Sequence, residues 1–132
     1  MANRIMVVED NDLNRKLFCD VLKANGFETL GVDDGNVVLD GARQFAPDLI
    51  IMDIQLPGIS GFDLIVAAKA DAELAGTPIL AVTAYAGKGD EEKIRDAGAA
   101  GYLSKPVSIM PFMAAVKELL PAPTPTPTPS AV

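Results

Sequence analysis

Short runs of consecutive apolar residues alternate along the chain with longer segments in which apolar residues recur every three or four positions. Short apolar runs bounded by turn residues predict strands, and these runs lie at residues 4–8, 27–32, 48–52, 78–82 and 101–104. Segments with helical spacing, caps and stop signals predict helices, and these lie at residues 13–24, 36–45, 62–72, 90–97 and 108–120. Because the two kinds of element alternate, we expect a parallel sheet with helices on both faces.

The order of the strands follows from the distances between the polar residues that end four of the runs. Asp10, Asp53, Thr83 and Lys105 are successively 43, 30 and 22 residues apart, and the first interval holds a whole additional strand and helix. The most apolar run, 48–52, is the expected central strand. These features predict an α/β, flavodoxin-like fold, a doubly wound five-stranded parallel sheet in the order 2-1-3-4-5. Its ligand crevice should lie at the carboxyl ends of the first and third strands.

The composition of the chain changes after residue 120. Residues 1–120 have the length and apolar content of one globular domain. Residues 121–132 are rich in Pro and Thr and predict an extended, disordered tail, either a plain solvated terminus or a ligand for a proline-recognising groove. No apolar run approaches the ~20 residues needed to cross a bilayer, and the first residues do not resemble a signal peptide. We therefore expect a cytoplasmic protein.

Charge and residue types restrict the ligands that the chain can bind. The net charge of −7 disfavours binding to nucleic acid and to anionic membrane surfaces. The chain has no histidine and one cysteine, which excludes imidazole catalysis, imidazole ligands and structural zinc sites. A bound metal would therefore be a hard cation on oxygen ligands, such as Mg²⁺, Mn²⁺ or Ca²⁺.

The polar residues at the strand ends form a candidate site for phosphoryl chemistry. Asp10 and Asp53 can coordinate Mg²⁺, and Glu9 can add charge and orient a metal-bound water. Asp53 can attack a phosphoryl donor as an aspartyl nucleophile, and Lys105 and the Thr83 hydroxyl can then hold the phosphoryl oxygens. Taken singly, these residues could be helix caps, turn residues or surface charges. Gathered at one sheet edge, the carboxylates predict a metal-free site strained by repulsion and stabilised by Mg²⁺.

Four motifs resemble those of bacterial response-regulator receiver domains, and the resemblance covers residues 4–120. The motifs are VVEDN at 7–11, MDIQLPG at 52–58, VTA at 82–84 and SKP at 104–106. The resemblance implies that Asp53 is the phosphoacceptor. It also implies a cofactor, Mg²⁺ with Mn²⁺ as a substitute, whose expected ligands are Glu9, Asp10, Asp53 and the backbone carbonyl of Gln55.

The same resemblance assigns roles to residues further along the chain. Thr83 and Lys105 would contact the phosphoryl group, and Tyr102 matches an aromatic residue that changes rotamer together with Thr83. A histidine kinase would dock near Asn14, Leu17 and the loop that contains Pro106. The surface that recognises downstream targets would comprise helix four, strand five and helix five, with the residues Tyr85, Lys88, Glu92, Arg95 and Tyr102.

A closer resemblance, to single-domain cell-division regulators of alphaproteobacteria, lies in residues 8–18, 52–61 and 83–95. It implies a response regulator of a two-component phosphorelay in cell-cycle or polarity control, which catalyses only its own phosphorylation and dephosphorylation. The implied partners are a histidine kinase, its phosphatase form or a phosphotransfer protein, and downstream protein targets. The protein itself is expected to be a monomer or a weak dimer.

Two other functions fit the predicted fold less well. A turnover phosphatase with an aspartyl nucleophile typically has a second aspartate two residues later, where this chain has Gln55, and a cap domain is not evident. A flavodoxin-like small-molecule binder needs a Gly- and Ser/Thr-rich phosphate loop after the first strand. The acidic segment 9–12 in that place would repel phosphate.

Overall fold

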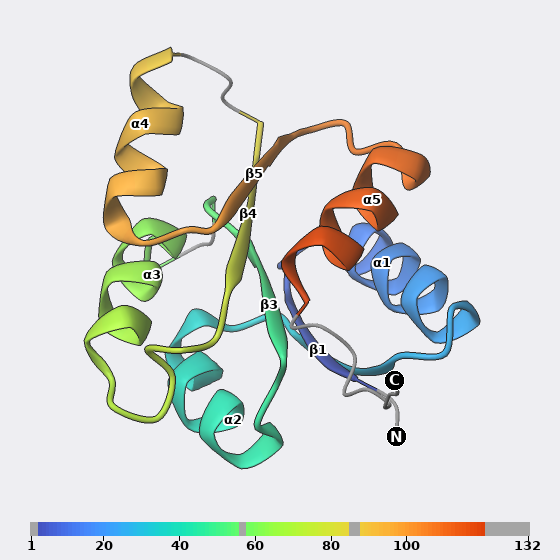
Figure 1. Ribbon diagram of the computed structural model, residues 1–132, viewed down its shortest axis with the longest axis horizontal. Helices are drawn as coiled ribbons and strands as arrows, with labels where there is room; N and C mark the ends of the chain where they lie inside the picture. The colour runs from blue at the N-terminus through green and yellow to red at the C-terminus, as the bar shows by residue number, and fades with distance from the viewer. Residues whose placement is uncertain (1–2, 56–57, 85–87, 121–132) are drawn as a thin grey trace, which may run out of the picture.

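Five parallel strands form one central sheet (Figure 1). The computed structural model describes residues 3–55, 58–84 and 88–120, so the tail predicted at 121–132 lies outside the described residues. The strands are β1 (Arg4–Val8), β2 (Glu28–Val32), β3 (Leu49–Asp53), β4 (Ile79–Thr83) and β5 (Gly101–Ser104). Their order is β2-β1-β3-β4-β5, which confirms the predicted doubly wound, flavodoxin-like fold.

Helices cover both faces of the sheet (Figure 1). One face carries α1 (Asp12–Ala24) and α5 (Ile109–Leu119), and the other carries α2 (Val38–Phe45), α3 (Gly61–Ala70) and α4 (Lys88–Ala97). A short 3₁₀ helix, η1 (Gly35–Val37), precedes α2. In the described part of the chain, no helix combines the length and apolar character needed to span a membrane.

Two hydrophobic layers pack against the sheet, one on each face. In β1, Ile5 and Val7 join the layer under α1 and α5, whereas Met6 and Val8 join the layer under α2, α3 and α4. Successive side chains of a strand point to opposite faces, so a strand covered on both sides must be apolar at nearly every position. This explains the unbroken apolar runs of the sequence and the complete burial of β3.

The ends of α1 are set by local side-chain and backbone preferences. The Asn11 side chain caps the helix by accepting a 2.9 Å hydrogen bond from the Asn14 N–H. Just beyond the helix, Gly26 has a φ of 87°, a left-handed conformation that glycine adopts without steric cost. Asn11 is therefore the N-cap of α1, and Gly26 follows its end.

The second predicted helix, at residues 36–45, is shorter than expected. The Asp34 side chain accepts a 2.9 Å hydrogen bond from the Asn36 N–H. This contact starts a tight 3₁₀ turn over η1, and the α-helical conformation begins only at Val38. Short polar side chains before a helix compete with the regular backbone bonding in this way.

The helix predicted at residues 62–72 ends at Ala70 instead. Asp71 is extended, and its carboxylate forms an ion pair with Arg43 of α2. This contact joins residues 28 positions apart, so a pattern of local apolar spacing cannot reveal it. The fourth helix, predicted at 90–97, begins two residues earlier, at Lys88.

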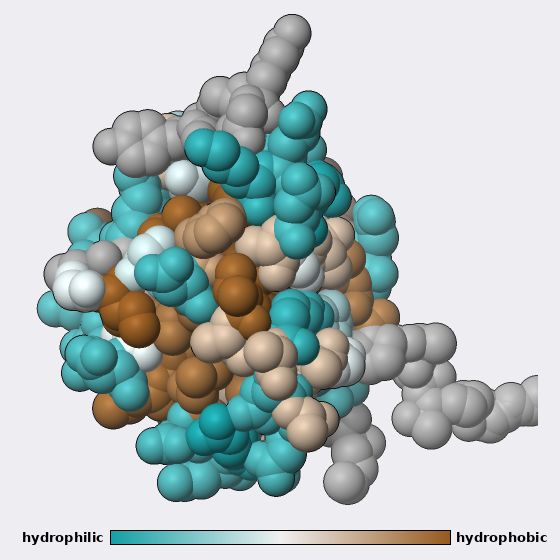
Figure 2. Space-filling view, turned by 90° about the vertical axis from the view of Figure 1, so that its left-hand side faces the viewer, coloured by the Kyte–Doolittle hydropathy of each residue, from teal (hydrophilic) through white to brown (hydrophobic). Residues whose placement is uncertain are grey.

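Both helical faces leave apolar side chains on the surface. Figure 2 views the face of α2, α3 and α4 and shows apolar residues gathered in its middle, with hydrophilic residues around them. Val66 of α3 is 47% exposed there. On the opposite face, Leu13 and Leu17 of α1 are 75% and 43% exposed. Isolated exposed apolar residues are ordinary, so their position relative to the candidate site decides which are of interest.

Candidate functional site

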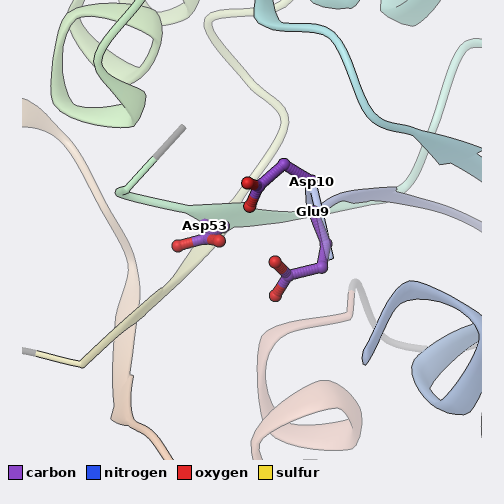
Figure 3. A group of neighbouring side chains, drawn as sticks. All are labelled: Glu9, Asp10 and Asp53. Atoms are coloured by element: carbon purple, nitrogen blue, oxygen red, sulfur yellow. The ribbon is translucent and has the colours of Figure 1, made fainter. Parts of the chain in front are cut away.

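Three carboxyl groups gather where β1 and β3 end (Figure 3). Glu9 and Asp10 follow β1, and Asp53 is the last residue of β3. Because β1 and β3 are hydrogen-bonded neighbours, the three side chains bring carboxylate oxygens within 4.8 Å of one another. Glu9 and Asp53 are buried, with exposures of 1% and 2%, whereas Asp10 is exposed.

Lys105 follows the outer strand β5 and brings a positive charge to this cluster. Its Nζ lies 3.1 Å from Glu9 Oε1 and 3.0 Å from Asp53 Oδ2. The lysine follows β5, and its backbone N–H donates a 2.7 Å hydrogen bond to the Thr83 carbonyl, which fixes the start of its side chain. Lys105 thus pairs with the two buried carboxylates.

The pKa values of the metal-free site reflect this arrangement. Burial, followed by the hydrogen bond with Asp53, raises the pKa of Glu9 to about 7, although Lys105 acts in the opposite direction. Burial also lowers the pKa of Lys105, but its hydrogen bonds to Asp53 and Glu9 outweigh that effect, so this pKa lies above its usual value. A proton near neutral pH therefore relieves part of the repulsion between Glu9 and Asp53.

Backbone contacts hold Asp53 from the other side. The Gln55 N–H donates a 2.9 Å hydrogen bond to Asp53 Oδ1, so Gln55 orients one carboxylate oxygen and Lys105 the other. Further along the chain, the Gly61 N–H donates a 3.0 Å hydrogen bond to the Ile54 carbonyl. A Cβ at Gly61 would lie 2.2 Å from the Asp53 carbonyl oxygen. The start of α3 therefore needs glycine for space.

The loop that carries Glu9 and Asp10 is also held by contacts that sequence reasoning missed. The Asn11 N–H donates to Glu9 Oε2 at 3.2 Å. Arg15 donates to the Glu9 carbonyl at 2.9 Å, while its second terminal nitrogen forms an ion pair with Asp12. The spacing of Asp12 and Arg15, three residues apart on a helix, was the available signal.

Thr83 and Tyr102, the predicted switch pair, lie on one face of the sheet. Thr83 ends β4 and is 1% exposed. Tyr102 is half-buried and pairs in register with Ala81, two residues before Thr83. Since alternate residues of a strand share a face, Thr83 and Tyr102 both lie toward the layer under α2, α3 and α4, where Tyr102 packs.

The predicted docking residues near the site come together around one hollow. Its volume is about 510 Å³. It is lined by Asn14, Leu17, Phe18, Ala84, Lys105, Pro106 and Val107. All three residues predicted to receive a histidine kinase, from α1 and the loop after β5, are therefore neighbours in space and adjoin the site lysine.

The predicted target-binding residues are only partly described. Glu92 and Arg95 are exposed on α4, where Arg95 pairs with Glu91 at 3.0 Å. α4 packs beside β5, which carries Tyr102. Tyr85 and the side chain of Lys88 lie outside the described residues.

The cluster has the chemistry of a site for a hard divalent cation. Glu9, Asp10 and Asp53 each offer a carboxylate oxygen, the ligand type that Mg²⁺ and Mn²⁺ prefer. Two of the three carboxylates are buried and repel each other, so a cation would remove an unfavourable interaction. Gln55, the expected carbonyl ligand, is tied to Asp53 through its own N–H.

Comparisons with known proteins identify the family of the chain. The response regulator receiver domain family matches residues 5–117. The polar-differentiation response regulators DivK of Brucella ovis and Brucella melitensis are each 49% identical over 120 residues, covering 91% of this chain and 98% of theirs.

Solved structures of response regulators share the fold. Chemotaxis response regulator CheY4 of Vibrio cholerae is 25% identical, with a TM-score of 0.86 over 91% of this chain and 100% of that one. The receiver domain of sensor histidine kinase PA1611 from Pseudomonas aeruginosa, with a magnesium ion coordinated in its active-site cleft, is 29% identical. Its TM-score is 0.82 over 90% of this chain and 98% of that one. This chain therefore belongs to the response regulator receiver domain family and, over nearly its whole length, is similar to DivK.

Proposed function

We propose that this protein is a phosphorylation-controlled interaction module that accepts a phosphoryl group from a histidine kinase on Asp53. In this step a carboxylate oxygen of Asp53 bonds to phosphorus, the P–N bond of the donor phosphohistidine breaks, and the imidazole leaves with that electron pair. The observation that carries the proposal is the contact of Lys105 with Asp53, beside two further carboxylates, at the carboxyl edge of the sheet.

Each residue of the site has a defined part in this proposal. The Lys105 ammonium stands 3.0 Å from Asp53 Oδ2, where it can neutralise charge on the phosphoryl oxygens. The Gln55 N–H holds Oδ1 and fixes the orientation of the nucleophile. The Thr83 hydroxyl is the proposed further donor to the phosphoryl group.

The proposed cofactor is Mg²⁺, with Mn²⁺ as a substitute. Glu9, Asp10 and Asp53 would hold the cation, together with the Gln55 carbonyl. When bound, the cation supplies positive charge between the carboxylates and the phosphoryl oxygens. Because metal ligands must be deprotonated, the raised pKa of Glu9 makes binding compete with a proton near neutral pH.

The output would be a shift in population between two conformations. Thr83 and Tyr102 share a face of the sheet, and α4 packs beside β5. A movement of Thr83 toward a phosphoryl group would leave room for Tyr102 and alter the surface with Tyr85, Lys88, Glu92 and Arg95. A target that prefers one conformation must in turn favour it. The similarity to the polar-differentiation response regulators DivK supports a role in cell-cycle or polarity control. The protein would act in the cytoplasm, as a monomer or weak dimer.

Phosphorylation of Asp53 can be tested directly. Acetyl phosphate with Mg²⁺ should add one phosphoryl group to the intact protein and none to Asp53→Asn, measured by mass spectrometry. Asp63→Asn, an exposed aspartate of α3, is the matched control and should be labelled like wild type. Phosphate on Asp53→Asn would move the acceptor elsewhere. Sustained multiple-turnover release of phosphate would instead favour a phosphatase.

The docking of the kinase can be tested separately. Leu17 borders the hollow beside Lys105, so Leu17→Asp should slow phosphotransfer from a phosphorylated histidine kinase while labelling by acetyl phosphate persists. Val66→Asp on α3 is the control, because Val66 and Leu17 have similar exposures of 47% and 43% on opposite faces of the sheet. Equal rates of kinase transfer to the two variants would place the docking surface elsewhere.

A further inference from the structure

The side chain of Gln55 connects two loops at the candidate site. Its amide oxygen Oε1 accepts a 3.0 Å hydrogen bond from the Ala84 N–H, and its own backbone N–H donates to Asp53 Oδ1 at 2.9 Å. Gln55 lies two residues after β3, and Ala84 directly follows β4. One residue therefore orients the phosphoacceptor with its backbone and holds the neighbouring loop with its side chain.

Ala84 lies at the same edge of the sheet as Asp53, because Asp53 pairs in register with Val82, two residues before Ala84. Ala84 and Lys105 line the same hollow of about 510 Å³, and Lys105 Nζ contacts Asp53 Oδ2. An anionic group on Asp53 that stays beside Lys105 would therefore lie toward the hollow that Ala84 also lines. Backbone N–H groups at the end of a strand are suitable donors to phosphoryl oxygens.

We propose that Gln55 is a positioning residue that occupies the Ala84 N–H while Asp53 is unmodified and releases it when Asp53 carries a phosphoryl group. This inference rests on the proposed phosphorylation of Asp53. The two acceptors compete for one donor: a neutral amide oxygen and a charged phosphoryl oxygen. Charge-assisted hydrogen bonds are roughly twice as strong as neutral ones, so the exchange is favourable. The free energy gained by the new hydrogen bond to the phosphoryl oxygen is reduced by the loss of the hydrogen bond between Ala84 and Gln55. Gln55 therefore biases the protein toward its unmodified state.

The affinity for beryllofluoride with Mg²⁺, a mimic of the phosphoryl group on aspartate, tests the competition. Gln55→Met keeps the length of the side chain and removes the acceptor, so beryllofluoride should bind roughly two- to tenfold more tightly, the factor that one net hydrogen bond supplies. Gln44→Met, at an exposed position of α2, is the matched control and should bind like wild type.

Hydrogen exchange of the Ala84 amide separates this role from simple space filling. Without beryllofluoride, the amide should exchange faster in Gln55→Met than in wild type, and beryllofluoride should bring both to the same slow rate. If Gln55→Met does not fold, isotope-labelled wild type suffices. An NMR scalar coupling across the hydrogen bond, between the Ala84 nitrogen and the Gln55 side-chain carbonyl carbon, should be present in the protein without beryllofluoride. It should vanish when beryllofluoride is bound.

Two failures can be told apart. Wild-type protein that binds no beryllofluoride at Asp53 would reject the proposed phosphorylation itself. Normal binding by wild type, with equal affinity and equal Ala84 exchange in Gln55→Met, would reject the role of Gln55 and leave phosphorylation of Asp53 standing. A coupling between Ala84 and Gln55 that persists with beryllofluoride bound would have the same meaning.

Discussion

The buried carboxyl group of Glu9 makes the metal-free protein sensitive to pH. Its pKa is raised from 4.5 to about 7 in the folded protein, so between these values the folded state binds more protons than the unfolded state. The stability that protonation contributes is present below the unfolded pKa and is lost as the pH rises through about 7. From about pH 6 to about pH 8 the free energy of unfolding should therefore fall by about 1 kcal/mol from this group.

Urea denaturation in EDTA at the two pH values measures this effect. Glu9→Gln resembles the protonated side chain and should lose this part of the pH dependence. Glu118→Gln, on the exposed surface of α5, should keep it. If the free energy of unfolding of Glu9→Gln fell with pH as steeply as that of wild type, another group would be responsible for the pH dependence.

At the scale of single residues, the sequence predicts which side chains reach the site better than how they are held. Asp53, Thr83 and Lys105 could be identified because each ends or follows an apolar run, and parallel strands end at a common edge. The contact of Gln55 with Ala84 could not, because it depends on the conformations of two loops 29 residues apart. The burial that shifts the pKa of Glu9 likewise becomes visible only when the helices are in place.

The junction of β3 and α3 depends on a residue without a side chain. A Cβ at Gly61 would lie 2.2 Å from the Asp53 carbonyl oxygen and 2.6 Å from the Ile54 Cα. Both neighbours are backbone atoms, so the clash cannot be relieved by a change of rotamer. Gly61→Ala should therefore destabilise the protein by about 1–3 kcal/mol, the usual cost of overpacking, and slow the labelling of Asp53 by acetyl phosphate.

Gly76→Ala is the matched control for this prediction. Nothing lies within 4 Å of the position that its Cβ would take. At a site without strain, replacing glycine by alanine is neutral or slightly stabilising, because it restricts the unfolded chain. Equal urea midpoints for Gly61→Ala and Gly76→Ala would mean that the junction of β3 and α3 adapts without cost.

At the scale of elements, local pattern predicts type and order, and tertiary contacts decide the boundaries. All five predicted strands and five predicted helices are present in the described residues. The helix predicted to run to residue 72 stops at Ala70, because Asp71 pairs with Arg43 from a different helix. Gly61 begins α3, but the close approach of its backbone to Asp53 and Ile54, which requires glycine there, appears only in the structure.

For the whole molecule, the order of the strands creates the site. β1 and β3 are neighbours only because the chain places β2 on the outer side of β1, and this adjacency brings Asp10 and Asp53 together. The Lys105 side chain then extends from β5 to the same edge. Charged side chains from three separated segments of the chain therefore interact at one site. A cation that binds there should stabilise all three segments, and with them the whole fold.

Mg²⁺ should raise the stability of the whole protein by mass action. A ligand that binds only the folded state adds about 2.7 kcal/mol at 100 times its dissociation constant, so the melting temperature should rise steadily with Mg²⁺ concentration. The rise should be larger at about pH 8 than at about pH 6, because a proton on Glu9, with its pKa of about 7, competes with the metal.

The Asp10→Asn variant tests whether the carboxylate cluster causes this stabilisation. In EDTA, Asp10→Asn should melt slightly above wild type because one of three clustered negative charges is gone. The gain should be small, since Asp10 is exposed. With Mg²⁺, the wild type should have the higher melting temperature, because Asp10→Asn lacks one metal ligand and is stabilised little by the cation. Asp63→Asn should follow wild type in both conditions. If Asp10→Asn kept the full wild-type rise with Mg²⁺, the cation would bind away from this edge of the sheet.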